Sequence, residues 1–390
     1  MENELLKRGV SKIYPTREAL EQQLQAGKKL RIYFGIDPTG NLHIGHAVQL
    51  KKLRGFQDLG HEIIILIGDF TARIGDPTDK SSARIQLSKD EVKKHAKNYK
   101  ELIGKILDTN KANLRFVSNE EWTKKLKPTD LLQLASHFTV SQLLERDMFQ
   151  ERIKAKKEIF LHEFMYPIFQ AYDAVILDVD MQIGGTDQTF NMLAGRTLMK
   201  KMNNKEKFVL TMEMLTSPSG KKMSKSEGKI IALDASADEM FGAVMSWPDD
   251  MIVEGLILLS NLSIAEIRQL EGEMKEGRNP KEIKEILAKE IVEMCHGKEK
   301  AEKAAKEFEN IFKNNELPVD IKEIKIEGNY PLPNLLVEVG LVSSGSEARR
   351  LIEASAVTID GAKCGDASAQ VAAHSGMIIK VGKRRFVKIK

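Results

Sequence analysis

The chain has 390 residues, 42% of them hydrophobic and 30% charged, and a formal net charge of +4. This length predicts two or three domains with real cores, and the composition excludes long disorder and a coiled-coil rod. The longest aliphatic run, residues 63–67, is far short of the ~20 residues of a membrane span, and the first ten residues lack the apolar stretch of a secretory signal. Two cysteines cannot build a disulfide framework. We expect a soluble, cytoplasmic protein that does not partner with a membrane.

Residues 1–232 alternate short apolar runs with amphipathic stretches. This alternation is typical of βα units around a parallel sheet. Residues 30–35 and 61–70 are predicted strands, and a helix is predicted over about 45–59. The first region is therefore expected to be an α/β domain.

Residues 233–328 are predicted to be α-helical, because they contain two capping boxes and an Asn-Pro helix start at Asn279. No catalytic constellation is evident there, and a helical connecting domain is expected. Residues 329–390 form a third region of small α+β character. Its predicted helices and strands cover residues 333–339, 346–354, 357–359, 377–381 and 385–389.

The third region also carries the excess positive charge. It contains nine Lys and Arg against five Asp and Glu, which equals the net charge of the whole chain. Such an asymmetry indicates a polyanionic partner for the C-terminal end. On charge alone, a solubilising basic tail explains it equally well.

The segment His43-Ile44-Gly45-His46 follows the first predicted strand and opens a helix. The free N–H groups and positive dipole end of a helix N-terminus favour an anion, and Gly45 lets a ligand approach the backbone. The two histidines can donate hydrogen bonds to a triphosphate. By itself the motif also fits an ordinary helix start.

A second motif, Lys222-Met223-Ser224-Lys225-Ser226, stands between Gly220 and Gly228. Two lysines this close can reach a polyphosphate as point charges, which matters most where charge builds in a transition state. A solvated lysine loop is the other interpretation of this motif. The two motifs together, in this order and about 180 residues apart, resemble the signature of class I aminoacyl-tRNA synthetases, which activate an amino acid with ATP on a Rossmann-type domain.

Finer blocks resemble the tyrosyl-tRNA synthetases in particular. They are residues 33–46, 75–78, 166–173 and 182–188, in the order of that family, and the resemblance extends over the whole chain. Two departures resemble its second bacterial branch. Phe34 stands where many members have Cys, which leaves a ribose contact open, and a full KMSKS loop stands where many have a KFGK-type loop.

The residues themselves support a tyrosine site. Tyr166, Gln170 and Asp173 have helical spacing i, i+4 and i+7, and therefore share one face of a predicted helix. A polar face in an otherwise apolar segment is costly to bury unless it meets a polar ligand. The ammonium and phenol hydroxyl groups of tyrosine are such a ligand.

The resemblance assigns roles to these residues. It implies that Tyr33 and Asp173 bind the phenol hydroxyl, and that the ammonium and carboxylate groups meet Thr71, Asp76, Tyr166, Gln170 and Gln188. The residues that it implies for ATP are Gly35, Asp37, Thr39, His43, Gly45, His46, Lys80, Arg84, Gly185, Asp187, Lys222, Met223, Ser224, Lys225 and Ser226. The catalytic set among them, which handles the phosphates, is Thr39, His43, His46, Lys222 and Lys225.

The last region resembles a small RNA-binding domain (αL) found in a ribosomal protein and in bacterial tyrosyl-tRNA synthetases. The expected partner is the tyrosine tRNA, whose phosphates attract basic side chains. An arginine-bearing structural helix is the alternative. The RNA-binding candidates are Arg349, Arg350, Lys383, Arg384 and Arg385.

The resemblance implies a tyrosine–tRNA ligase that uses ATP with Mg²⁺ carried by the nucleotide, without a dedicated protein metal site. Three alternatives remain at this point: a tryptophanyl-tRNA synthetase, an HxGH nucleotidyltransferase making a small metabolite, and an RNA-binding protein that kept the synthetase fold. The family also implies a homodimer. The expected interface lies within residues 125–165, whose apolar content equally fits a buried core: Leu131, Leu132, Leu134, Phe138, Leu143, Leu144, Met148 and Phe149.

Overall fold

The computed structural model describes residues 2–78, 87–216, 230–313, 323–382 and 385–390. The chain forms two compact units, Met1–Ala301 and Glu302–Lys390. The boundary expected at residue 232 falls inside the first unit, so the helical region and the α/β region form one compact body. The division into three domains stays a prediction.

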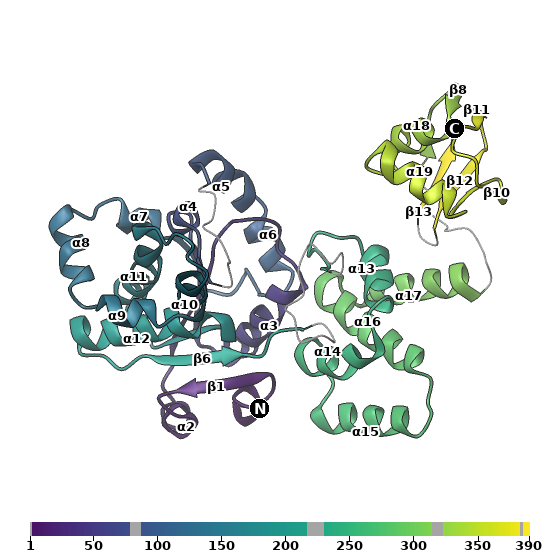
Figure 1. Cartoon of the computed structure of the whole chain (residues 1–390). Helices are drawn as coiled ribbons and strands as arrows, with labels where there is room; N and C mark the ends of the chain where they lie inside the picture. The colour runs from purple at the N-terminus through teal and green to yellow at the C-terminus, as the bar shows by residue number, and fades with distance from the viewer. Residues whose placement is uncertain (1, 79–86, 217–229, 314–322, 383–384) are drawn as a thin grey trace. The chain divides into compact units, whose positions relative to one another are not determined.

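A six-stranded sheet in the order β1-β6-β5-β2-β3-β4 forms the centre of the first unit (Figure 1). All its pairs are parallel except β1 with β6 at the edge. The chain winds outward from β2 to β3 and β4, then returns to place β5 and β6 on the other side of β2. The point where the strand order reverses therefore lies between β2 and β5, and ligands bind there in doubly wound folds. The strands are β1 (Val10–Tyr14), β2 (Arg31–Ile36), β3 (Glu62–Ile67), β4 (Leu114–Ser118), β5 (Met181–Gly185) and β6 (Phe208–Met212).

The domain has the α/β fold that the sequence predicts. The central strands of its sheet are apolar on both faces, which is typical of a parallel sheet covered by helices on both sides. The predicted strands over 30–35 and 61–70 and the helix over 45–59 appear as β2, β3 and α3, with shifted ends. The helices up to β6 are α1 (Glu2–Leu5), α2 (Arg17–Gln25), α3 (Ile44–Asp58), α4 (Thr71–Ile74), α5 (Lys89–Ala96), α6 (Tyr99–Gly104), α7 (Glu120–Thr123), α8 (Pro128–Ala135), α9 (Val140–Leu144), α10 (Asp147–Lys154), α11 (Leu161–Leu177) and α12 (Thr189–Asn203), with the 3₁₀ turn η1 (Thr186–Gln188).

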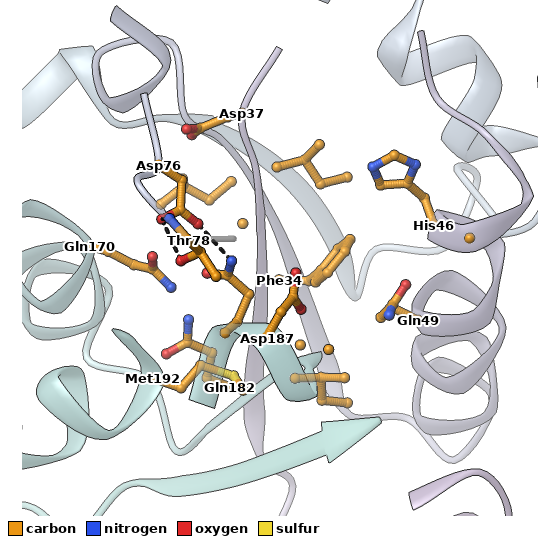
Figure 2. Close-up of a pocket in the computed structure, with 18 of the residues that line it drawn as sticks. Phe34, Asp37, His46, Gln49, Asp76, Thr78, Gln170, Gln182, Asp187 and Met192 are labelled. Carbon is orange, nitrogen blue, oxygen red and sulfur yellow. Dashed lines mark hydrogen bonds between the residues drawn. The ribbon is translucent and has the colours of Figure 1, made fainter. Parts of the chain in front are cut away.

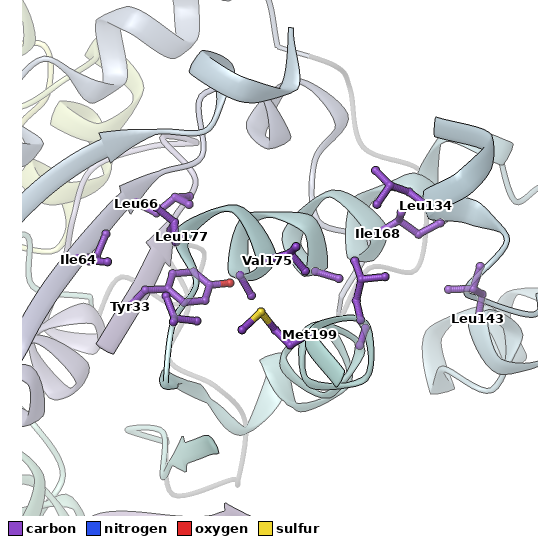
Figure 3. Close-up of a cluster of buried hydrophobic side chains, with 14 residues drawn as sticks. Tyr33, Ile64, Leu66, Leu134, Leu143, Ile168, Val175, Leu177 and Met199 are labelled. Atoms are coloured by element: carbon purple, nitrogen blue, oxygen red, sulfur yellow. The ribbon is translucent and has the colours of Figure 1, made fainter. Parts of the chain in front are cut away.

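Helices α11 and α12 pack against each other and against the buried ring of Tyr33. Figure 3 shows this ring in a cluster that includes Leu66, Val175 and Met199. The ring hydroxyl points toward α11, where it donates to the carbonyl of Gln170 at 3.4 Å. The core thus holds the Tyr33 ring in place where β2 and β5 lie side by side.

The helical region up to residue 301 belongs to the same unit, and hydrogen bonds of Arg8 tie it to the sheet domain. The Arg8 guanidinium donates to carbonyls at the C-terminal end of α14, including Ile257 at 2.7 Å and Ser260 at 2.7 Å. Capping boxes at Ser236 and Ser263 begin α13 and α15, as the sequence predicts. The elements are α13 (Ala237–Met245), η3 (Asp249–Met251), α14 (Ile252–Leu259), α15 (Ile264–Lys275), α16 (Pro280–His296) and α17 (Lys298–Lys313).

The second unit has its own core, in which two helices cover a five-stranded sheet in the order β10-β9-β12-β13-β7. Both helices and the three strands expected in the last region are present, each within one residue of its predicted ends. The elements are β7 (Glu323–Ile324), β8 (Gly328–Pro331), α18 (Leu332–Glu338), α19 (Gly345–Glu353), β9 (Val357–Ile359), β10 (Ala362–Cys364), β11 (Gln370–Ala373), β12 (Ile378–Val381) and β13 (Arg385–Ile389). No helix in the described ranges of either unit is long and apolar enough to cross a bilayer.

Candidate active site

A cavity of about 710 Å³ opens where the strand order reverses (Figure 2). Its walls come from the ends of β2 and β5, the start of α3, the turn before α5 and one face of α11. Every candidate of the tyrosine and ATP sites that the structure describes lines this cavity: Tyr33, Gly35, Asp37, Thr39, His43, Gly45, His46, Thr71, Asp76, Tyr166, Gln170, Asp173, Gly185, Asp187 and Gln188. The candidates Lys80, Arg84, Lys222, Met223, Ser224, Lys225 and Ser226 lie outside the described residues.

Helix α11 presents its polar face to this cavity, as the i, i+4, i+7 spacing predicts. Tyr166, Gln170 and Asp173 all line it, and Asp173 is only 2% exposed. In Figure 2, Gln170 and Asp76 lie on one side of the cavity, and His46 and Gln49 lie on the other. The cavity therefore has two chemically distinct ends.

The Asp173 carboxylate is held by two side chains that no sequence motif indicated. Trp122 Nε1 donates to its Oδ1 at 2.8 Å, and Asn119 Nδ2 donates to its Oδ2 at 3.1 Å. Burial raises the pKa of Asp173 to about 7, and the two donors oppose that rise. The carboxylate is thus fixed in place with acceptor capacity remaining, next to the Tyr33 ring. Burial, followed by the nearby Asp173 charge, also raises the pKa of Tyr33 well above its usual value.

A chain of hydrogen bonds continues from this end of the cavity to Asp37. Asn119 Nδ2 donates to Thr71 Oγ1 at 3.1 Å, and Thr71 donates to Asp37 Oδ1 at 2.7 Å. The second oxygen of Asp37 accepts from the Tyr166 hydroxyl at 2.9 Å. Thr71 and Tyr166, predicted for tyrosine, and Asp37, predicted for ATP, therefore form one network.

Asp76 anchors a second network. Its Oδ2 accepts from Gln188 Nε2 at 2.7 Å, and its Oδ1 accepts from the Thr78 hydroxyl at 2.6 Å. Arg146 donates to that hydroxyl at 2.7 Å and lies 3.6 Å from Asp76 Oδ1. Two carboxylates, Asp37 and Asp76, thus line the cavity near Gln170, and carboxylates suit an ammonium ligand.

The other end of the cavity is the start of α3. His43 is the N-cap of this helix, and its Nδ1 accepts from the Gly45 N–H at 3.2 Å. His46 Nδ1 accepts from the His43 N–H at 3.2 Å, and the two ring centroids are 4.0 Å apart. Because each Nδ1 accepts, the neutral rings carry their proton on Nε2 and are donors there. The segment that begins at residue 230 is hydrogen-bonded to the start of α3, since the Ile44 N–H donates to the Ile231 carbonyl at 2.8 Å.

Phe34 and Gln49 also line the cavity, and both are largely buried. The ribose contact that the resemblance leaves open at Phe34 stays a prediction. In the described ranges, no group of three or more His, Cys, Asp or Glu side chains is placed to hold a metal ion.

In the second unit, Arg349 and Arg350 lie exposed on α19. Arg385 is also exposed, but its guanidinium donates to the Leu341 carbonyl at 2.7 Å and to Glu347 at 2.9 Å. It therefore has a structural role on this surface. Lys383 and Arg384 lie outside the described residues.

The fold is of Rossmann type, with a cavity where its strand order reverses, and comparison with known proteins shows the class of protein. Residues 25–313 match the family model of class I tRNA synthetases (W and Y), and residues 307–389 match the tyrosine–tRNA ligase SYY-like C-terminal domain. The chain belongs to the tyrosine–tRNA ligases within the class I tRNA synthetases.

The sequences of curated relatives align with nearly the whole chain. The tyrosine–tRNA ligase of Carboxydothermus hydrogenoformans is 44% identical, with 99% of this chain and 97% of the relative covered. That of Thermotoga maritima is 42% identical, with 99% and 96% covered. Membership of this family sets aside a metabolite enzyme and an RNA-binding protein without catalysis. The names of these relatives favour tyrosine over tryptophan.

Solved structures support the fold. A C-terminally truncated mitochondrial tyrosyl-tRNA synthetase of Aspergillus nidulans aligns with a TM-score of 0.66 at 23% identity, covering 79% of this chain and 93% of that chain. A tyrosyl-tRNA synthetase of Archaeoglobus fulgidus, solved with L-tyrosine, aligns with a TM-score of 0.61 at 21% identity, covering 77% and 98%.

Proposed function

We propose that this cavity joins L-tyrosine to ATP and then passes the tyrosyl group to the 3′-terminal adenosine of the tyrosine tRNA. The observation that carries the proposal is the buried Asp173 carboxylate beside Tyr33, held by two donors at one end of the cavity. A phenol hydroxyl fits between Asp173 as acceptor and Tyr33 as partner. Sites built to bond a hydroxyl reject the analogue that lacks it by about 10⁵, and tyrosyl-tRNA synthetase against phenylalanine is the known example of that rule.

The hydrogen-bond networks of Asp37 and Asp76 offer partners for the ammonium and carboxylate groups of tyrosine. Asp76 and Gln170, with Tyr166 tied to Asp37, offer acceptors for the ammonium group. Gln188 lies beside Asp76 and suits the carboxylate side. Gly185 and Asp187, which line the cavity next to Gln188, are proposed to contact the ribose of ATP.

The phosphates are proposed to lie over the start of α3. There, the Nε2–H groups of His43 and His46 and the helix dipole stabilise negative charge. Thr39 joins them from the preceding turn, and Lys222 and Lys225 keep the phosphate role that their motif implies. The carboxylate of tyrosine attacks the α-phosphorus and pyrophosphate leaves, so no protein nucleophile is needed, and the protein contributes positioning and charge stabilisation.

We propose that Mg²⁺ enters with ATP, bound to the phosphates of the nucleotide. We also propose that the protein works in the cytoplasm, and that Arg349 and Arg350 on α19 contact tRNA phosphates.

A homodimer is proposed through the segment 125–165. Half of the expected apolar set, such as Phe149, is buried within its own unit. The same segment nevertheless exposes large apolar side chains, which mark interaction surfaces when they cluster. They are Leu132, Val140, Ile153, Phe160 and Leu161.

The test of the whole function is aminoacylation. The protein is incubated with ATP, Mg²⁺ and labelled tyrosine or tryptophan, together with a tyrosine or tryptophan tRNA transcript. We expect label only on the tyrosine tRNA and only from tyrosine. Charging of the tryptophan tRNA, or no charging by folded protein, would contradict the proposal.

A further inference from the structure

A lysine is buried beneath the amino-acid end of the cavity without an acidic partner. Lys207, just before β6, has no exposed surface. Its Nζ donates to Gln182 Oε1 and to the Met192 carbonyl at 3.1 Å. Both acceptors are neutral, and no ion pair to Lys207 is present in the part of the chain that the structure describes. Burial alone lowers its pKa well below the usual value for lysine.

Such burial is costly, because an amine loses its hydration without gaining a counter-charge. The surroundings nevertheless make room for it. A Cβ at Gly195 of α12 would lie 2.6 Å from Lys207 Nζ, so a larger residue there would displace the amine. The Nζ also lies 5.7 Å from the centroid of the Tyr33 ring, which has its edge in the cavity.

The partner of this lysine lines the cavity. Gln182 on β5 pairs with Tyr33 on β2 in parallel register, so their side chains lie next to each other on one face of the sheet. Figure 2 shows Gln182 at the cavity with Met192 and Gln170. Lys207 occupies the amide oxygen of Gln182, the only acceptor of that side chain.

The amide nitrogen of Gln182 has a different environment. Within the described residues it makes no hydrogen bond, and it is not among the side-chain atoms that are both buried and unpaired. Since Gln182 lines the cavity, this nitrogen is directed to the space that a ligand fills. Without Lys207, the side-chain amide of Gln182 would be free to rotate by half a turn and direct its oxygen into the cavity instead of its nitrogen.

We propose that Lys207 is a positioning residue for the amino-acid substrate: by holding Gln182 Oε1, it directs the Gln182 Nε2–H donor into the amino-acid end of the cavity beside Tyr33. The proposal rests on the proposed function, because the ligand of that donor is the bound tyrosine. It adds to the site Lys207, which no sequence motif indicates, and gives a role to Gln182, which the block 182–188 contains without a role assigned to it.

The test is a double-mutant cycle measured by ATP–pyrophosphate exchange with tyrosine. The variants are Lys207→Met, Gln182→Met and the two together, with KM determined for tyrosine and for ATP. We expect Lys207→Met to raise the KM for tyrosine about 3- to 10-fold, the range that one lost hydrogen bond gives, while the KM for ATP stays within about twofold. In the Gln182→Met background, the second substitution is expected to change the KM for tyrosine by less than about twofold.

A matched control is Lys52→Met. Lys52 is likewise buried and donates only to carbonyls, those of Leu5 at 2.6 Å and Arg8 at 2.7 Å, but it does not line the cavity. Its loss is expected to lower Tm and to leave both KM values unchanged. This separates a general effect of removing a buried amine from an effect on the substrate.

If a single variant does not fold, the double variant decides, because it leaves neither the amine nor the amide without its partner. Its KM for tyrosine is expected to exceed that of the wild type by about 3- to 10-fold. An unchanged KM in folded Lys207→Met or in the double variant overturns the inference, and so does an equal rise for ATP or an undiminished effect of Lys207→Met in the Gln182→Met background. Absence of tyrosine-dependent exchange in the wild type would instead refute the proposed function itself.

Discussion

We propose that Asp173 carries the selectivity of the cavity, through its charge and through the two groups that hold it. The carboxylate is buried, and Trp122 and Asn119 take one lone pair on each oxygen. A buried acceptor that is held in advance discriminates more strongly than a mobile one, because a ligand without a hydroxyl leaves it unpaired.

Asp173→Asn is expected to lower kcat/KM for tyrosine about 10- to 150-fold in pyrophosphate exchange, since a hydrogen bond to a charged group is lost. Asp180→Asn is the matched control. Asp180 is also buried and accepts from the Arg31 N–H at 2.8 Å, but it lies outside the cavity wall. Its substitution is expected to reduce stability only, and full tyrosine use by Asp173→Asn would refute the role of Asp173.

The raised pKa of Asp173 predicts a dependence of stability on pH. Its folded value of about 7 exceeds the ordinary value of 3.8, so the native protein takes up this proton more readily than the unfolded chain. Its contribution to the free energy of unfolding is therefore fully present below about pH 4 and is lost as the pH rises through about 7. Urea denaturation between about pH 5 and about pH 8 is expected to show a smaller decline for Asp173→Asn than for the wild type. Equal declines would contradict a pKa of Asp173 that burial raises in the folded protein.

At the end of β3, the backbone approaches the side chains of Asp37 and Thr71 closely. Gly68, which follows β3, has no room for a side chain: a Cβ would lie 2.0 Å from Asp37 Oδ1 and 2.4 Å from Thr71 Oγ1. The hydrogen bond between those two side chains thus depends on a glycine at the strand end.

Gly68→Ala is expected to destabilise the protein by about 1–3 kcal/mol, as overpacking does, and to raise the KM for tyrosine. Thermal or urea unfolding and pyrophosphate exchange measure the two effects. Gly272→Ala is the control, because nothing lies within 4 Å of its Cβ position on α15 and alanine favours a helix. A folded Gly68→Ala protein of wild-type stability would show that this contact is not required.

At the scale of elements, local spacing predicted the polar face of α11 and the start of α3, whereas the resemblance supplied most of the other site residues. The two helices and three of the strands of the last region were predicted nearly to their ends, but β7, β8, β10 and β11 were not predicted. Asn119, Trp122 and Lys207 were not predicted. They lie directly after β4, on α7 and directly before β6. No local pattern distinguishes a buried partner of a distant carboxylate or amide from a surface residue.

At the scale of the molecule, exposed apolar surface indicates self-association. Leu132 on α8 is 72% exposed and Leu161 on α11 is 79% exposed. Replacing both by Asp is expected to convert a dimer of twice 43.9 kDa into a monomer in sedimentation at micromolar concentration. The control is Val337→Asp on α18, which is expected to leave the dimer intact. A wild-type protein that sediments as a 43.9 kDa species would refute the dimer.

The second unit is expected to add affinity for RNA without base specificity. Arg349→Gln with Arg350→Gln should weaken binding of tyrosine tRNA and reduce the slope of log affinity against log salt by about 1 per arginine. Filter binding at several salt concentrations measures this slope. Pyrophosphate exchange serves as the control, because the cavity lies within the first unit and needs no RNA.

The most direct test of the central claim is ATP–pyrophosphate exchange driven by each amino acid in turn, without tRNA. The claim is that the cavity between β2 and β5 activates an amino acid and reads a phenol hydroxyl through Asp173 and Tyr33. Exchange with tyrosine, and none with phenylalanine or tryptophan at the same concentration, is the predicted result. Exchange with tryptophan in place of tyrosine, or comparable exchange with phenylalanine, would contradict the assignment of Asp173 and Tyr33.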